Sequence, residues 1–415
     1  MPHAPSPLLW DVLEEHLDEA AFAGGQLERS FTSPLHRIED VEQGEEERLL
    51  ANIDGLVLGG TAVATRLLLP ALEEENAELT FAAALALLTL DASTYWGAVV
   101  AGLEEAPEPM RVARSRALEL APFALDPVRL APLLTAKGGP LLLTGLEVAI
   151  GRRMTVASSV LDTALRAGSV QLKTRAIVAA AQGGAVEARE LEAAVPDEDP
   201  AVQAALATAL LTLDPKRGLA RCRALLGSKV PSAWRAGALG LALCSDQPED
   251  LERILGFDPP LGREALWALG FSGRAVAADR CLEVALASKP LRRVGCEAFA
   301  AISGADREAP RLFTTGPASE EEDPLAPDAQ LLEGDVEGLV AWWKRNRERF
   351  RVEQRCLRGL PLDGPRLRDA LLTEPMRRRP ALALQIQVRL AQRVPVRTRA
   401  LSQVQRADVA ALPQK

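Results

Sequence analysis

The chain has 415 residues, of which 48% are apolar and only 4% aromatic, and its formal net charge is −9. This apolar fraction is sufficient for a large core, and the negative charge excludes a polyanion binder that acts through its overall charge. Because Ala and Leu dominate the apolar residues, the composition favours helices over strands.

The charge is distributed unevenly along the chain. Residues 341–415 contain 18 Arg and Lys against 6 Asp and Glu, which gives +12 there and about −21 in the residues before. Residues 11–50 hold 12 acids against 3 bases. We therefore expect an acidic front and a basic tail that attract each other, within one chain or between copies.

Near the N-terminus, helices are expected over 8–28 and 44–78, neither with a repeated phrase. Because the outer face of a stacked helical array must be polar, residues 1–104 are predicted to form a helical N-terminal cap region. No basic segment followed by an apolar core opens the sequence. The cysteines are scattered, without a C-x-x-C pair, and suit reduced thiols. A cytoplasmic location is the expectation.

The stretch "FAAALALLTLDASTYWGAVVAGL" (81–103) is long enough to cross a bilayer. Asp91 near its centre would be costly in lipid, and Asp-Ala-Ser is a suitable helix N-cap. A buried helical hairpin is therefore predicted, with a membrane span as the alternative.

Phrases such as "PDEDPAVQAALATALLTLDP" (196–215) recur over residues 105–305. Aligning the polar residue before each Ala-rich core gives seven equivalent positions, 28 to 32 residues apart: Arg116, Thr144, Arg175, Gln203, Arg235, Arg263 and Arg293. A period near 30 is typical of stacked helical pairs, and Pro or Asp-Pro suits the first turn of each helix. The opening "DPAVQAA" at 199–205 resembles the D-P-x-V-x-x-A-A opening of a HEAT repeat. The predicted fold is all-α, an α-solenoid of HEAT-like helical hairpins over 105–305 with a helical N-terminal cap.

Residues 306–330 are rich in Pro, Gly, Ser and acids and predict an acidic, Pro-rich loop. Helical patterns return over 333–350 and within 364–405. Residues 331–415 are therefore predicted to be a basic C-terminal helical region that continues the array.

The two ends carry a more specific resemblance. "LLWDVLEEHLDEAAFAGGQLERSF" (8–31), "EEERLLANIDGLVLGG" (45–60) and the basic segment 341–391 resemble the end signatures of an uncharacterised HEAT-repeat family of proteobacteria. Members of that family are often encoded near type VI secretion genes, so the resemblance implies a secretion-system component or effector as partner. It brings no assigned activity. Asn52 stands where the family usually has His.

No catalytic, cofactor or metal motif stands out in the chain. His16 lies one turn from Glu19, but only two other histidines are available to complete a metal site. No G-x-S-x-G occurs, and the glycines of "GLVLGGTAV" (55–63) lack phosphate-loop spacing and predict a close helix contact. We expect no cofactor, no metal and no catalytic residue; a HEAT-like lyase is a minor alternative.

Five of the seven equivalent positions are arginines: Arg116, Arg175, Arg235, Arg263 and Arg293. Equivalent positions of a solenoid form a ladder along one surface, and these five residues are called here the ladder arginines. Three interpretations are open: structural pairing with acids of neighbouring repeats, a protein-binding face, or a nucleic-acid-binding face on the concave side.

The stretch "AWWKRNRERFRVEQRCLRG" (341–359) combines two tryptophans with six arginines. Neighbouring residues of a helix diverge by about 100°, so we expect one of Trp342 and Trp343 to pack into the array and the other toward the loop or a partner. Together with Arg345 and Arg349 they are typical of a structural joint first and a binding surface second.

From these patterns, the expected function is a non-catalytic protein-binding scaffold or adaptor. The alternative is a nucleic-acid-binding HEAT-like protein. A mixed or acidic charge around the arginine ladder would favour the first, and a continuous positive groove the second. The oligomeric state and the binding face stay open.

Overall fold

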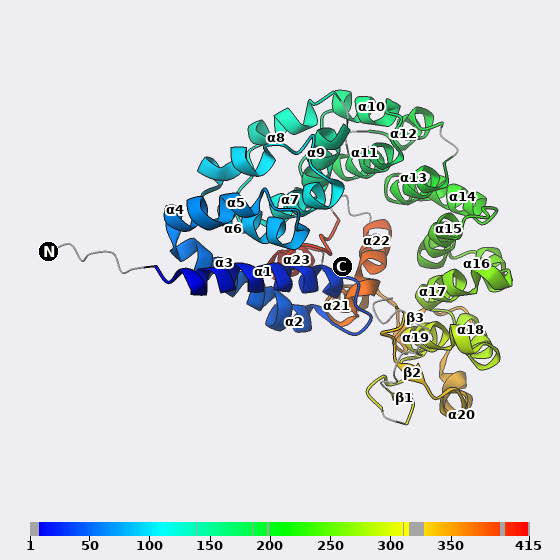
Figure 1. The fold of residues 1–415 in the computed structure, drawn as a ribbon. Helices are drawn as coiled ribbons and strands as arrows, with labels where there is room; N and C mark the ends of the chain where they lie inside the picture. The colour runs from blue at the N-terminus through cyan, green and yellow to red at the C-terminus, as the bar shows by residue number, and fades with distance from the viewer. Residues whose placement is uncertain are drawn as a thin grey trace. The chain divides into compact units, whose positions relative to one another are not determined.

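The computed structural model describes residues 8–137, 139–184, 186–196, 199–309, 311–314, 328–390 and 395–413. Within these ranges the protein is all-α, as the composition predicts (Figure 1). The described strands form only two short antiparallel pairs: β1 (Phe313–Thr314) with β2 (Glu333–Gly334), and β3 (Cys356–Leu357) with β4 (Leu360–Pro361). Most of the predicted acidic loop, residues 310 and 315–327, lies outside the described residues.

The chain divides into two compact units. Unit 1 is the described part of Met1–Thr32, His36–Gly183 and Arg397–Asp408. Unit 2 is the described part of Ser33–Leu35, Gly184–Val396 and Val409–Lys415. Each unit is described by itself below.

Unit 1 is built from helices of the first half of the chain and one helix from near the C-terminus. They are α1 (Trp10–Ser30), α2 (Ile38–Val41), η1 (Glu42–Glu46), α3 (Glu47–Leu58), α4 (Gly60–Val63), η2 (Ala64–Leu68), α5 (Leu69–Ala71), α6 (Ala77–Val100), α7 (Glu108–Leu120), α8 (Pro127–Leu134), α9 (Gly139–Arg152), α10 (Ser158–Arg166), α11 (Val170–Gly183) and most of α23 (Ser402–Ala410).

Unit 2 contains the second half of the repeats and the segment that follows them. Its helices are α12 (Ala188–Ala194), α13 (Pro200–Leu213), α14 (Pro215–Leu225), α15 (Pro231–Cys244), α16 (Pro248–Leu255), η3 (Pro259–Leu261), α17 (Gly262–Ser272), α18 (Ala275–Ala287), η4 (Lys289–Leu291), α19 (Arg292–Ser303), α20 (Val336–Asn346), η5 (Arg347–Arg349), α21 (Gly364–Thr373), η6 (Met376–Arg378) and α22 (Arg379–Arg389).

The expected alternation of two helices per repeat is present. The seven equivalent positions fall, in order, on α7, α9, α11, α13, α15, α17 and α19, and one further α-helix lies between each of these and the next. Within unit 1, α9 contacts α7 and α11; within unit 2, α15 contacts α13 and α17. Asp199 and Asp214 accept hydrogen bonds from the first N–H groups of α13 and α14, as Asp-Pro openings predict. One continuous solenoid through both units stays a prediction.

The apolar stretch 81–103 lies mostly in α6, which consists of two helical segments that meet at a kink at Asp91. Asp91 has non-helical dihedral angles (φ −161°, ψ 94°), and its side chain accepts hydrogen bonds from the backbone N–H groups of Ser93 and Thr94. The carboxylate therefore caps a second helical segment as predicted, and the hairpin itself stays a prediction. By length and composition α6 could cross a membrane, although 44% of its apolar window is buried. The pair Ile38–Leu58 and Gly60–Ala71, bent by 103°, passes the same test.

The basic tail pairs with the acidic front inside unit 1. The Arg406 guanidinium donates to the Glu42 carboxylate, with an Nη2–Oε2 distance of 2.6 Å, and Arg399 pairs with Glu28 of α1. The attraction expected from the charge distribution therefore operates within one chain for these residues.

In unit 2, α22 contacts α13 and α15, so this part of the 331–415 region packs back along earlier helices. The apolar side chains of this region share a core with α15 and α17: Ile386 and Leu367 are buried together with Leu243, Trp267 and Phe271. This packing covers part of the helical face that a repeat array would leave open.

Candidate partner-binding surface

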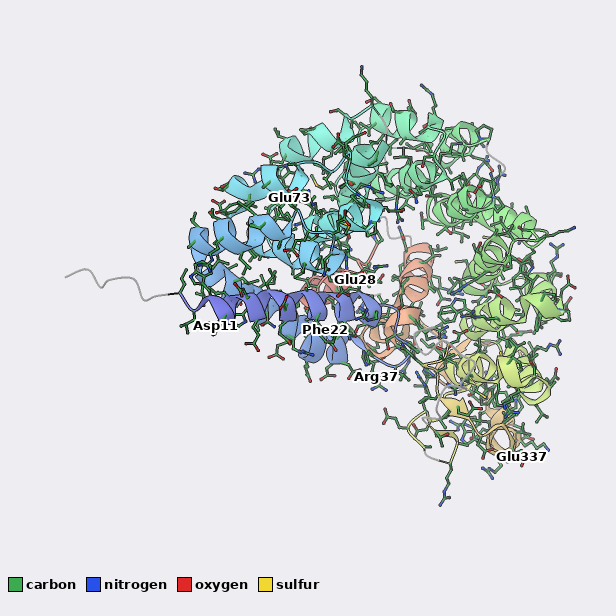
Figure 2. All side chains as sticks on the ribbon, in the orientation of Figure 1. Asp11, Phe22, Glu28, Arg37, Glu73 and Glu337 are labelled. Carbon is green, nitrogen blue, oxygen red and sulfur yellow. The ribbon has the colours of Figure 1, made fainter. Side chains whose placement is uncertain are left out.

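In unit 1 the two ladder arginines are both paired with carboxylates. Arg116 donates from Nε to Glu28 of α1, which Figure 2 labels, at 2.5 Å, and from Nη1 to Glu119 at 2.6 Å. Only 11% of its side chain is exposed. Arg175 is half exposed and lies 3.5 Å from Glu147 of α9. Arg116 is therefore a structural residue, and Arg175 presents a charge that is already balanced.

In unit 2, two further ladder arginines bind carboxylates from the segment that follows the repeats. Arg293 donates from Nε to Glu333 at 2.9 Å and from Nη1 to the Ala329 carbonyl oxygen at 2.7 Å, and 12% of its side chain is exposed. Arg263 forms an ion pair with Asp328, and 55% of its side chain is exposed.

Arg235 of α15 differs from the other four ladder arginines. It is exposed, and its guanidinium lies over the ring of Trp267, 5.0 Å from the ring centroid. Its recorded contacts include no ion pair with a described carboxylate. Desolvation, followed by the nearby Arg377 charge, lowers the pKa of Arg235, and the carboxylates of Glu264 and Asp328 oppose this shift. Charges of both signs therefore surround this side chain.

Both tryptophans of the basic stretch pack against the same ring. Trp342 and Trp343 of α20 meet Phe299 of α19 edge-on, with centroid distances of 6.1 and 5.2 Å. The two indoles also stack, 6.3 Å apart with an interplanar angle of 12°. The expectation that they point to different sides is wrong, because long indole side chains from adjacent positions can bend toward one neighbour.

The same stretch is fixed to α18 through one carboxylate. The Nε1–H group of Trp343 donates to Asp279 Oδ1 at 2.6 Å, and Arg347 donates from Nη2 to Asp279 Oδ2 at 3.0 Å. Arg345 and Arg349 are exposed on the outer side, where Arg349 donates to Asn346 at 3.0 Å. One side of the stretch is a structural joint, and the other is an exposed basic face.

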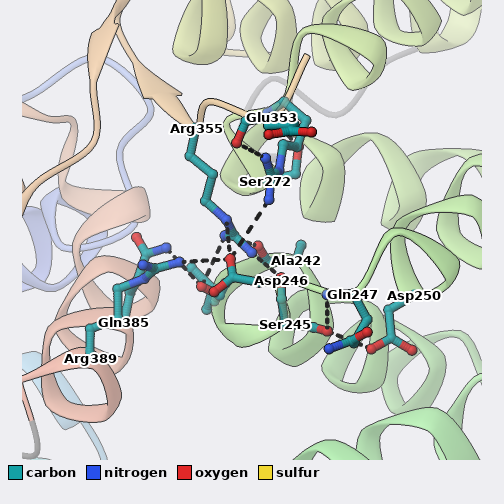
Figure 3. A network of polar contacts seen from close by, with 12 residues as sticks. Ala242, Ser245, Asp246, Gln247, Asp250, Ser272, Glu353, Arg355, Gln385 and Arg389 are labelled. Carbon is teal, nitrogen blue, oxygen red and sulfur yellow. Dashed lines mark hydrogen bonds and ion pairs between the residues drawn. The ribbon is translucent and has the colours of Figure 1, made fainter. Parts of the chain in front are cut away.

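Arg355 caps the C-terminal end of α15, a role that sequence analysis missed. Its Nη1 group donates to the carbonyl oxygens of Ala242 and Leu243 at 2.7 and 3.1 Å. Asp246 pairs with Arg355 at 3.1 Å and with Arg389 at 3.7 Å (Figure 3). The last carbonyls of a helix have no partner within the helix, and a guanidinium can satisfy several of them. Burial, then repulsion by Arg389, lowers the pKa of Arg355 to about 10.

Residues Arg355–Gly359, called here the crossing segment, continue across the ends of two further helices. The Cys356 N–H donates to the Gly273 carbonyl after α17 at 2.7 Å. The Gly359 N–H donates to the Ile302 carbonyl near the end of α19 at 2.9 Å. The crossing segment therefore ties α15, α17 and α19 together by backbone and guanidinium hydrogen bonds.

Beneath this segment lies a buried cluster of arginines around one carboxylate. Glu374, 3% exposed, accepts two hydrogen bonds from Arg358 at 2.6 and 2.8 Å and pairs with Arg378 at 3.1 Å. Arg378, 1% exposed, also donates to the Gly270 carbonyl at 2.9 Å and lies over the Phe271 ring. Burial raises the pKa of Glu374, but the Arg358 charge and hydrogen bond outweigh it, so that the pKa is lowered.

His16, the residue weighed as a metal ligand, has a neutral partner. Its Nδ1 atom lies 2.8 Å from Asn52 Oδ1, and Gly55 lies so close that a Cβ there would meet the imidazole. Among the described residues, no group of three or more His, Cys, Asp or Glu side chains is placed to hold a metal ion. The predicted close helix contact in 55–63 is thus made by Gly55.

The five cysteines are free thiols in or near the core. Burial raises the pKa of Cys222, Cys244 and Cys296 to about 12 and that of Cys281 further. At neutral pH these sulfurs remain protonated and are poor nucleophiles.

Searches of protein-family models and of curated proteins find no match to this chain.

Proposed function

We propose that this protein is a non-catalytic scaffold or adaptor that binds another protein. The observation that carries the proposal is the mixed charge along the arginine ladder. Glu28, Glu147, Asp328 and Glu333 each lie beside a ladder arginine. Nucleic-acid backbones require accumulated positive charge, whereas alternating charges suit the polar rim of a protein interface.

We further infer that the partner is a component or effector of a type VI secretion system and that the complex forms in the cytoplasm. Both inferences rest on the resemblance of residues 8–31, 45–60 and 341–391 to the HEAT-repeat family described above. An α-solenoid would provide the extended surface that such an adaptor uses.

Recovery of a specific partner tests this proposal directly. The full chain carrying an affinity tag is expressed in its native cell at its natural level, and co-purified proteins are quantified by mass spectrometry. The expected result is one partner at a near-stoichiometric ratio. Recovery of no specific protein at such a ratio contradicts the scaffold proposal.

One observation favours the nucleic-acid alternative, namely the exposed basic face formed by Lys344, Arg345, Arg349 and Arg351. A gel-shift assay with single- and double-stranded oligonucleotides at two salt concentrations separates the two functions. Binding through phosphate contacts weakens steeply with salt: the logarithm of the binding constant falls linearly with the logarithm of the salt concentration, with a slope of about −0.7 to −0.9 for each contact. We expect no shift at physiological salt; a salt-sensitive shift there would favour nucleic acid.

A further inference from the structure

Residues Arg397–Asp408, called here the C-terminal strap, belong to unit 1 and are held there mainly by polar groups. Three side chains of the strap are buried, and all three are polar: Ser402 and Gln405 are 0% exposed and Asp408 is 7% exposed. The apolar side chains of the strap are at most partly buried. Because burial of apolar surface is the main stabilising contribution in folding, the strap is held less firmly than the helices with apolar cores.

The residues on either side of the strap are held differently. Val396, Val409 and Leu412 are assigned to unit 2 and are buried in an apolar core of that unit. The strap is therefore a polar segment of the chain between two apolar anchors.

The basic residues of the strap form ion pairs that are partly open to water. Arg399 pairs with Glu28 of α1, and Arg406 pairs with Glu42 of η1 at 2.6 Å. In the second pair, 40% of the arginine side chain and 39% of the glutamate side chain are exposed. Ion pairs of this kind contribute little to stability, and salt weakens them further.

The acidic end of the strap has a partner of its own. Asp408 accepts hydrogen bonds from Nη1 and Nη2 of Arg153 at 2.8 and 2.6 Å, and from Arg397 within the strap at 2.9 Å. The surface of unit 1 beneath the strap therefore carries both signs of charge, and Glu28 keeps a second partner there, Arg116.

The helical part of the strap depends on unit 1 for its first turn. Glu46 accepts hydrogen bonds from the N–H and hydroxyl groups of Ser402, the first residue of α23. Glu42 and Glu46 both lie in η1, which is a π-helical turn, a feature that is frequent at functional sites. Because an isolated helix as short as α23 is marginal in water, α23 should unfold when it leaves η1.

We propose that the C-terminal strap is a conformational switch that leaves unit 1 as one element while the rest of unit 1 stays folded. Its opening uncovers the carboxylates of Glu42 and Glu46, whereas Glu28 keeps Arg116. Higher ionic strength shifts the equilibrium toward the open form because it screens the pairs of Arg399 and Arg406. This inference goes beyond the proposed scaffold function and does not depend on it.

Hydrogen–deuterium exchange of the full chain, followed by mass spectrometry, tests the opening. Exchange is measured at about 50 and about 500 mM salt. We expect the amides of residues 402–408 to exchange about three- to tenfold faster at the higher salt concentration. The amides of residues 80–88, a buried run of α6 in the same unit, should change by less than about twofold and show that unit 1 stays folded.

Carbodiimide labelling of carboxyl groups measures what the opening exposes. Glu46 is 5% exposed in the closed form, so its labelling should rise with salt in proportion to the exchange of residues 402–408. Labelling of Glu46 that does not follow this exchange overturns the proposal.

A charge exchange separates opening of the strap from fraying of its helix. Arg406→Glu should accelerate exchange of residues 402–408 about tenfold at low salt, because it replaces attraction to Glu42 by repulsion. Combining it with Glu42→Arg should restore the rate to within about threefold of the wild type. Gln403→Ala, at an exposed position of the same helix, is the matched control and should change the rate by less than about twofold.

Three results overturn the switch. The first is exchange of residues 402–408 that does not depend on salt. The second is equal acceleration of residues 402–408 and 80–88, which would mean that unit 1 opens as a whole. The third is an equal effect of Arg406→Glu with and without Glu42→Arg.

Discussion

Glu46 and Ser402 are 356 residues apart in the sequence and are joined by three hydrogen bonds in unit 1. The Ser402 N–H donates to both Glu46 carboxylate oxygens at 2.9 and 2.8 Å, and the Ser402 hydroxyl donates to Oε2 at 2.8 Å. Ser402 is the first residue of α23. A carboxylate from η1 therefore caps a helix that lies near the other end of the chain.

Replacement of Glu46 should separate its charge from its hydrogen bonds. Burial raises the pKa of Glu46 above its ordinary 4.5, so the folded state favours the neutral form. The stabilising contribution of this group is therefore present below the ordinary pKa and is lost as pH rises through the folded pKa. Glu46→Gln keeps an acceptor for Ser402, and we expect unchanged or higher stability at pH 7. Glu46→Ala should cost about 1–3 kcal/mol because buried donors lose their partner.

Thermal unfolding of the wild type and both Glu46 variants between pH 4 and pH 8 checks this prediction. An equal loss for Glu46→Gln and Glu46→Ala at pH 7 would show that the negative charge itself is needed.

Glu374→Gln should strongly destabilise unit 2. The substitution removes the charge that Arg358 and Arg378 share in a buried site, and breaking such a pair costs about 3–5 kcal/mol. Because the folded pKa of Glu374 is lowered, its contribution is present above the ordinary value of 4.5 and is lost as pH falls through the folded pKa. Urea unfolding at pH 7 measures the cost. The exposed Glu348→Gln serves as control, with an expected change within about 0.5 kcal/mol.

Gly304→Ala tests the crossing segment. Gly304 has φ +72°, and a Cβ there would collide with the Arg358 carbonyl oxygen. Gly102 has a similar φ of +68° but no atom within 4 Å of the added carbon. Both substitutions should lose about 1–2 kcal/mol for backbone strain, and Gly304→Ala about 1–3 kcal/mol more for the collision. Chemical denaturation measures the free energy of unfolding of both variants. Equal losses would mean that the crossing segment moves away from the added Cβ at no cost in free energy.

Trp343→Ala should destabilise the protein more than Trp342→Ala. Trp343 is 6% exposed and donates to Asp279, whereas Trp342 is only partly buried. Removing the buried indole should cost about 3–5 kcal/mol, and removing its neighbour about half as much. Denaturant midpoints of the two variants provide the measurement. The reverse order would place the main anchor of α20 at Trp342.

Local sequence features predicted the elements well and their long-range contacts poorly. The spacing of Arg235, Arg263 and Arg293 placed successive first helices because helix pairs repeat with a fixed number of residues. Asp91 was recognised as an N-cap because capping depends on neighbours in sequence. How the two segments of α6 on either side of Asp91 pack against other helices depends on residues distant in sequence, which no local pattern encodes.

The partners of the arginines could not be predicted for a similar reason. Any of many carboxylates could have paired with Arg293, and Glu333 was selected by the position of the segment after the repeats. The contacts of Arg355 with helix-end carbonyls leave no trace in periodicity, since every helix ends in carbonyls. The excess of Arg in residues 341–359 was the available signal. It indicated a structural joint but did not show which helices the joint connects.

The crossing segment imposes an order on biosynthesis. The Ala242 carbonyl at the end of α15 receives its hydrogen bond from Arg355, 113 residues later, so a ribosome exposes this helix end well before its cap exists. Ser402, the partner of Glu46, is translated 356 residues after it. Nascent repeats would therefore leave the ribosome with helix-end carbonyl groups that lack their final hydrogen-bond donors. They would reach their final stability only after most of the polypeptide has been translated. Chaperones could bind them during this interval.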